Sequence, residues 1–208
     1  MVWTAKPSGI LRKVRQIEID CNRTSYNNSD LAQAFPASVR ADALHVASTL
    51  PQHSWNTKSF SVRVGTETVF IPYRIYHDPA LIDPIRLTPL QIELLDCLLT
   101  RHHSGFVREK HLKKIVCANH EWTPPFVVQL IGEYVIEILR VIRTNVQNLD
   151  PQLYRRFLTS NPAFFSLTKQ RVASYWDCYH RQQRREDYAG FQIVEVFDRL
   201  AGKENSRA

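Results

Sequence analysis

The sequence contains few of the features that mark specialised protein classes. Its 208 residues include only six glycines and 11 prolines, too few for a collagen-like or linker-dominated chain. It has no Gly-rich phosphate loop, no HExxH, no GxSxG and no kinase signature. We therefore expect a non-enzymatic protein that needs no cofactor. A Cys/His nucleophile pair stays open, because such pairs assemble in space rather than in sequence.

Long hydrophobic runs are also missing. The longest apolar-rich stretch, residues 126–142, is interrupted by Gln129, Glu133, Glu137 and Arg140 and is too polar to cross a membrane. The first 15 residues lack the continuous apolar segment of a signal peptide. The cysteines lie far apart and form no CxxC motif. These observations predict a cytoplasmic protein without membrane contact, whose cysteines are free thiols.

The composition is that of an ordinary folded protein with a basic surplus. Hydrophobic residues make up 44% and charged residues 23%, which excludes a wholly disordered chain. The length suits one domain or two small ones. The 27 Lys and Arg residues outnumber the 20 Asp and Glu residues and give a net charge of +7. Such a surplus favours polyanionic partners, nucleic acid among them.

Residues 59–76 have the alternation of a β-hairpin. Phe60, Val62 and Val64 alternate with polar residues, and apolar residues alternate again after a turn at residues 65–67. Pro72 restricts the return strand to a sheet edge or a bulge. The sequence thus predicts one small antiparallel sheet.

Helical spacing of apolar residues dominates the rest of the chain. Residues 88–91, Thr-Pro-Leu-Gln, combine an N-cap, a proline at the first helical position and a capping-box glutamine. One helix is expected to begin there. The other expected helices lie at about 30–46 (kinked at Pro36), 108–117, 123–142, 151–160, 167–185 and 191–200. The predicted fold class is mostly α with a small antiparallel β-sheet (α+β).

Three motifs follow the predicted hairpin in a set order. Residues 87–105 open with Leu-Thr-Pro and continue through paired leucines, residues 106–116 contain Val-Arg-Glu-x-x-Leu, and residues 123–139 form the apolar segment TPPFVVQLIGEYVIEIL. In this order they resemble the three helices of the winged helix-turn-helix effector domain of OmpR/PhoB-type regulators. The resemblance implies DNA binding and transcription regulation, with residues 123–139 in the place of the recognition helix.

The resemblance divides the chain into three parts. A winged-helix-like centre is expected at about residues 58–147. An N-terminal segment with one helix (1–57) and a C-terminal helical extension (148–208) are expected to pack on it.

The third helix departs from the family's pattern. It carries Gly132, Glu133 and Tyr134 where the family has basic residues, and the carboxylates of Glu133 and Glu137 would repel phosphates. Residues 145–190 also contain no hairpin pattern for a wing. These departures favour an alternative, a protein–protein interaction adaptor or dimerisation module on a winged-helix scaffold that has lost DNA recognition.

Two groups of basic residues are candidates for nucleic-acid binding. On a winged helix, the first group would contact phosphates rather than bases, although a solvated helix face gives the same pattern. In the second, arginines interleave with aromatic residues that could stack bases, although Tyr175, Trp176 and Tyr179 also share one helical stripe, as core residues do. The candidates are Arg101, Arg108, Lys110, Lys113 and Lys114 in the first group and Arg181, Arg184 and Arg185 in the second.

A metal site is weighed and not expected. Residues 97–120 contain six Cys and His side chains, but only Cys117 and His120 have the close spacing of a zinc-ligand pair that includes a sulfur. Cys97 lies among leucines and is typical of a core residue. The sequence therefore predicts a cytosolic DNA-associated regulatory protein, binding mainly through phosphate contacts and associating as a homodimer or with a protein partner.

Overall fold

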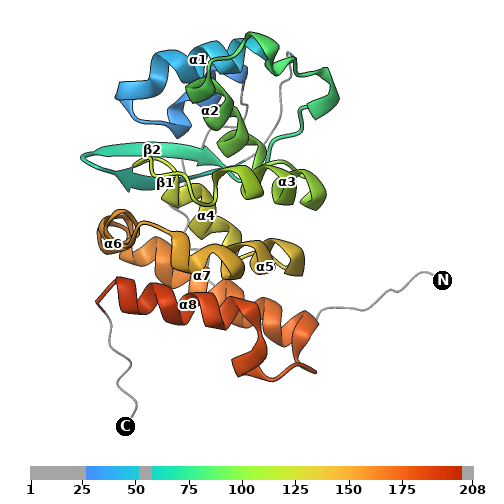
Figure 1. The fold of residues 1–208 in the computed structure, drawn as a ribbon, viewed down its shortest axis with the longest axis vertical. Coiled ribbons are helices and arrows are strands. Elements are labelled where there is room, and N and C mark those ends of the chain that lie inside the picture. Colours follow the sequence, from blue (N-terminus) through green and yellow to red (C-terminus); the bar gives the residue numbers. More distant parts are fainter. Residues whose placement is uncertain (1–26, 52–57, 203–208) are drawn as a thin grey trace, which may run out of the picture.

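A computed structural model describes residues 27–51 and 58–202, so the predicted N-terminal segment is seen only in part. The elements stack along the long axis of the molecule (Figure 1). Helices α1 and α2 lie at one end, the β-hairpin and α3 come next, and α4 follows. Helices α5 to α8 form the other end. The predicted class, mostly helical with a small antiparallel sheet, is confirmed.

The N-terminal helical region is broken by Pro36, as predicted. A 3₁₀ segment, Asn28–Ala34, precedes the proline, and a short 3₁₀ turn leads into α1, Arg40–Thr49. The N-cap of this segment is Asn27. The Asn27 side chain accepts a hydrogen bond from the Asp30 N–H, while the Asp30 carboxylate accepts one from the Asn27 N–H. This reciprocal box satisfies two backbone donors that the first turn would otherwise leave unpaired.

The predicted hairpin is confirmed. Strands β1, Ser59–Val64, and β2, Glu67–Pro72, pair in antiparallel register. Gly65 occupies the turn with a φ of 58°, a conformation that side chains with a Cβ rarely adopt. Pro72 is the last residue of β2, so its missing N–H removes no hydrogen bond from the middle of the sheet.

The two helices after the hairpin begin at distinct signals. Thr88 and Gln91 form the expected capping box at the start of α2, Pro89–Leu99. Helix α3, Gly105–Ile115, begins three residues earlier than predicted, directly after Ser104. The two helices pack against each other, and α1 packs on α2.

The prediction of one long third helix over residues 123–142 is wrong. Helix α4, Pro124–Ile131, ends at Gly132, and α5, Ile136–Asn145, begins after the extended residue Val135. All eight residues of α4 are buried, whereas α5 buries only one side. The break lets the chain turn out of the core while Glu133, between the two helices, remains buried.

The C-terminal end is helical throughout the described residues. Asp150 caps α6, Pro151–Ser160, as predicted, through its side-chain bonds to the next backbone N–H groups. Helix α7, Pro162–Tyr175, continues into a π-helical turn, Trp176–His180, so the expected helix over 167–185 begins and ends too late. Helix α8, Ala189–Leu200, packs against α5, α6 and α7.

One hydrophobic core connects these layers. Phe35, before α1, stacks on Phe126 of α4 with ring centroids 5.4 Å apart, and Phe165 of α7 contacts Phe197 of α8. In the described part of the chain, no helix is both long and apolar enough to cross a membrane. Cys97, Cys117 and Cys178 are free thiols, while Cys21 lies outside the described residues.

Candidate nucleic-acid interface

Three predicted lysines lie on the exposed side of α3. Lys110 makes no ion pair with any described residue. Lys113 lies 2.7 Å from Glu109, one turn earlier on the same helix, with more than half of its side chain exposed. Such an exposed pair is weak and leaves the lysine able to exchange partners.

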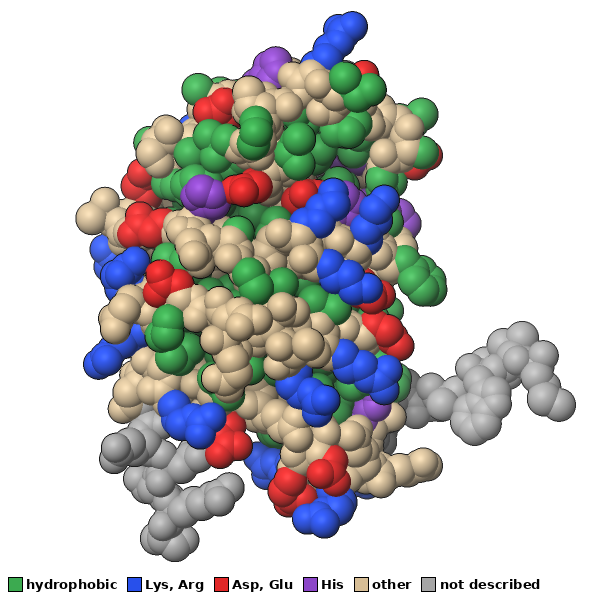
Figure 2. Space-filling view, viewed as in Figure 1, with side chains coloured by type: hydrophobic (Ala, Val, Ile, Leu, Met, Phe, Trp, Pro, Cys, Tyr) green, Lys and Arg blue, Asp and Glu red, His purple; other side chains and the backbone are tan. Residues whose placement is uncertain are grey.

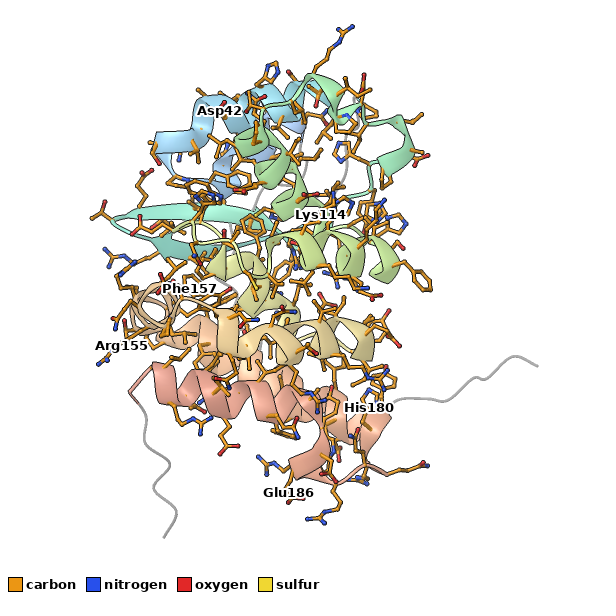
Figure 3. All side chains as sticks on the ribbon, in the orientation of Figure 1. Asp42, Lys114, Arg155, Phe157, His180 and Glu186 are labelled. Atoms are coloured by element: carbon orange, nitrogen blue, oxygen red, sulfur yellow. The ribbon has the colours of Figure 1, made fainter. Side chains whose placement is uncertain are left out.

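Lys114 is held more firmly, because it pairs with a buried carboxylate. Asp96 of α2 is only 3% exposed, and its Oδ1 lies 3.0 Å from the Lys114 ammonium and 2.5 Å from Nδ1 of His111. In Figure 3, Lys114 lies where α3 meets α2. This contact fastens α3 to α2, so Lys114 is less available to an external phosphate than Lys110.

Arg140 of α5, which no local sequence pattern indicates, joins these lysines. It is exposed and makes no ion pair with any described residue. A shallow groove of about 370 Å³ between α3 and α5 is lined by both Lys113 and Arg140. Figure 2 shows Lys and Arg side chains gathered over α3 and α5, with carboxylates between them. The α3–α5 strip is defined as Lys110, Lys113, Lys114 and Arg140.

Arg101 and Arg108, both predicted to contact phosphates, do not belong to this surface. Their exposed fractions are 0% and 1%. Arg108 shares the inner face of α3 with Leu112 and Ile115, at spacings of four and seven residues. The prediction that Arg108 points outward is therefore wrong, and both guanidinium groups face the interior.

The buried arginines converge on Glu133. Its carboxylate lies 2.9 Å from Nη2 of Arg74, 3.4 Å from Nη2 of Arg108 and 3.8 Å from Nη2 of Arg101. Arg101 also donates to the carbonyls of Pro72 and Tyr73. The arginine cluster is defined as Arg74, Arg101, Arg108 and Glu133.

Backbone carbonyls complete the coordination of Arg108. Its Nη1 donates to the carbonyls of both His102 and His103 at 2.8 Å. His102 is fixed by the same loop, since its Nδ1 accepts from the Ser104 N–H and its Nε2 lies 2.9 Å from the His77 carbonyl. Burial lowers the pKa of His102, so this ring is a neutral structural group.

The arginine cluster keeps a surplus of positive charge. Burial lowers the pKa of Arg101 to about 9, and the charges of Arg74, Arg108 and Arg171 act in the same direction, against the attraction of Glu133. Burial also lowers the pKa of Arg108. Both groups remain protonated at neutral pH, so three guanidinium groups share one carboxylate.

The second predicted group of arginines lies far from the first. Arg181, Arg184 and Arg185 are exposed, and Arg181 and Arg184 pair with nearby acids on their own segment. Arg185 lies over the ring of Phe191 at 4.3 Å. Figure 3 shows Glu186, in the same turn, near the opposite end of the long axis from Lys114. The two basic groups therefore do not form one surface.

The aromatic side chains in the segment 174–187 lie in different environments. Trp176 packs edge-on against Phe191, and its indole N–H donates to the Gln183 carbonyl. Tyr179 is 67% exposed, and its ring forms a cluster with those of Tyr175 and Tyr134, with all three centroid separations between 6.0 and 6.1 Å. The predicted core stripe thus holds for Trp176 but not for Tyr179.

Cys117 and His120 have separate neighbours. The Cys117 thiol contacts the Asn145 side chain, whereas His120 stacks on Trp122 and pairs with Glu93. Across residues 27–51 and 58–202, no group of three or more His, Cys, Asp and Glu side chains is arranged to hold a metal ion.

Comparison of the chain with family models, with curated proteins and with solved structures finds no match. The function is therefore inferred from the geometry and charge of the chain itself.

Proposed function

We propose that this chain is a non-enzymatic, cytosolic, DNA-associated regulatory protein that contacts the phosphate backbone through the α3–α5 strip. The observation that carries the proposal is the placement of Lys113 and Arg140 around one groove between two packed helices, with Lys110 exposed on the same helix as Lys113. Lysine and arginine side chains on exposed helix faces neutralise phosphates without reading base sequence. The expected behaviour is binding to many sequences with a strong dependence on salt.

The burial of Glu133 supports this proposal. On a single exposed third helix, its carboxylate would repel phosphates. In the structure, it is 4% exposed and lies within 4 Å of three guanidinium groups. Glu109 and Glu137 both line the groove. Glu109 pairs with Lys113, whereas Glu137 is exposed, makes no ion pair with any described residue and opposes an anion there. The net charge of the strip and its groove still favours a polyanion because Lys110 and Arg140 are unpaired.

The element order also supports the proposal. A hairpin precedes α2, α3 and α4, the order expected of a winged-helix-like unit, and α2 and α3 pack as a pair. The outer face of α3, rather than a recognition helix, would then meet the duplex, since every residue of α4 is buried.

A binding measurement tests the proposal. Fluorescence anisotropy of a labelled mixed-sequence duplex of about 25 bp is followed against purified protein at several salt concentrations. The protein is expected to bind the duplex at low salt. The logarithm of the affinity is expected to fall linearly with the logarithm of the salt concentration. Absence of binding at about 50 mM salt contradicts the proposal.

A protein partner is the second candidate function, and a different surface favours it. Phe106, at the start of α3, is 87% exposed, and Ile85, before α2, is 88% exposed. Exposed apolar side chains mark a protein contact where they form a contiguous patch. Sedimentation analysis of the chain and of its Phe106→Ser variant tests for self-association, and a monomer at all concentrations argues against a homodimer.

A further inference from the structure

The arginine cluster has hydrogen-bond donors that the protein does not use. Nη1 of Arg101 and Nε of Arg108 are buried without a hydrogen-bond partner among the described residues. A buried polar group without a hydrogen-bond partner destabilises the fold, and more so when the group is charged. The cluster is thus incomplete in both charge and hydrogen bonding.

A fourth arginine lies at the edge of the cluster. Arg171 of α7 packs its aliphatic stem against Gly132, where a Cβ would lie 3.2 Å from the Arg171 Cβ and Cδ atoms. Its guanidinium carbon lies 5.5 Å from the ring centroid of Tyr73. Arg171 makes no ion pair with any described residue and is half-buried. Glycine at position 132 therefore lets this arginine approach the junction between α4 and α5.

The cluster is open to solvent on one side. The side chain of Arg74 is 28% exposed, and Arg171, whose charge acts on Arg101 as that of Arg74 does, is partly exposed. The fully buried Arg101 and Arg108 contact the same Glu133 carboxylate as Arg74. Arg74 already donates from Nη1 to the Tyr73 carbonyl and from Nη2 to Glu133, so its remaining N–H groups and the guanidinium fork of Arg171 are what an anion would meet there.

Aromatic rings lie beside this opening. Tyr134 follows Glu133 directly in the chain, and its ring centroid lies 6.0 Å from that of Tyr175 and 6.1 Å from that of Tyr179. Tyr134 and Tyr179 are 53% and 67% exposed. Exposed tyrosine faces stack on planar rings such as nucleic-acid bases.

We propose that Arg74 and Arg171 bind the phosphate of a small phosphate monoester that carries an aromatic ring, of the nucleoside monophosphate class. Arg101 and Arg108 supply further positive potential, and Tyr134 and Tyr179 stack on the ring. The anion compensates the surplus positive charge that Glu133 leaves. This site is separate from the α3–α5 strip and does not depend on DNA binding.

Isothermal titration calorimetry on the full chain at low ionic strength tests the proposal with AMP, inorganic phosphate and adenosine as probes. AMP is expected to bind one site, more tightly than inorganic phosphate, and adenosine is expected to bind at least about tenfold more weakly than AMP. Arg171→Gln is expected to weaken AMP binding at least about tenfold. Arg155→Gln, an exposed arginine of α6 (Figure 3), removes the same charge and is expected to change it less than about twofold.

Three further results are decisive. Tyr179→Ala is expected to weaken AMP binding and leave phosphate binding unchanged, and equal affinities for AMP and phosphate would overturn the part played by the ring. The double variant Lys110→Ala with Arg140→Ala is expected to leave AMP binding intact, so the result of this test is independent of DNA binding.

Two results would overturn the site: no saturable binding of AMP or phosphate at about 10 mM, or equal losses of AMP binding in Arg171→Gln and Arg155→Gln. Thermal unfolding of Arg171→Gln checks that the variant remains folded.

Discussion

Arg108 of α3 and Glu133, between α4 and α5, form a buried ion pair with 3.4 Å between Nη2 and Oε2. The pair ties the second helix after the hairpin to the point where the third helix breaks. It also removes Arg108 from the surface and cancels the repulsion that Glu133 would exert on phosphates. One contact therefore changes the interpretation of both residues.

Glu133→Gln is expected to destabilise the fold by about 3–5 kcal/mol, because it removes the only carboxylate that compensates the described arginines of the cluster. Urea unfolding followed by circular dichroism measures the free energy. Glu137→Gln, an exposed glutamate on α5, serves as the matched control and is expected to change it by less than about 0.5 kcal/mol. A loss below about 1 kcal/mol for Glu133→Gln would show that the ion pairs are dispensable.

Tyr188→Phe is expected to remove part of the alkaline sensitivity of the fold. Burial raises the pKa of Tyr188 to about 12, whereas an unfolded tyrosine ionises near pH 10. The native state therefore retains the proton longer, so the contribution of Tyr188 is fully present below pH 10 and is lost as the pH rises through 12. The loss amounts to about 2–3 kcal/mol.

The hydroxyl of Tyr188 has no hydrogen-bond partner among the described residues, so Tyr188→Phe is expected to keep its stability at pH 7 within about 1 kcal/mol. Unfolding free energies at pH 8 and pH 11 give the comparison. Tyr179→Phe, whose ring is exposed, is expected to follow the wild type at both pH values. If Tyr188→Phe loses as much unfolding free energy between pH 8 and pH 11 as the wild type does, the alkaline loss does not come from Tyr188.

Asn161→Ala is expected to destabilise the fold by about 2–3 kcal/mol. The Asn161 side chain accepts from the Arg63 N–H at 2.8 Å and donates to the Arg63 and Phe157 carbonyls at 2.9 Å. It therefore links β1 to the junction of α6 and α7 and satisfies buried backbone groups. Thermal unfolding checks the loss, with the exposed Asn148→Ala as control. Equal melting temperatures for the two variants would show that the link contributes little.

Local sequence signals are sufficient to predict several helix starts and the first strand. The capping box of Thr88 and Gln91, the cap at Asp150 and the alternation in β1 depend on residues within a few positions of one another. Such short-range patterns have the same meaning in the sequence and in the fold.

The break in the third helix could not be predicted in the same way. The apolar period continues through residues 132–135, and the partners of Glu133 come from positions 74, 101 and 108. Because these contacts are distant in sequence, local pattern alone predicts Arg101 and Arg108 to be surface residues, whereas both are buried. Arg140 was missed because only the packing of α5 on α3 places it beside Lys113.

The central claim is that the α3–α5 strip contacts phosphates, and the salt dependence of duplex binding tests it most directly. Anisotropy titrations compare the wild type, Lys110→Ala with Arg140→Ala, and Arg155→Ala with Arg156→Ala, two exposed arginines of α6. Both double variants remove two positive charges. The strip variant is expected to lower the magnitude of the salt slope by about two, whereas the α6 variant leaves it unchanged. An unchanged slope in the strip variant, or an equal fall in the α6 variant, would contradict the account.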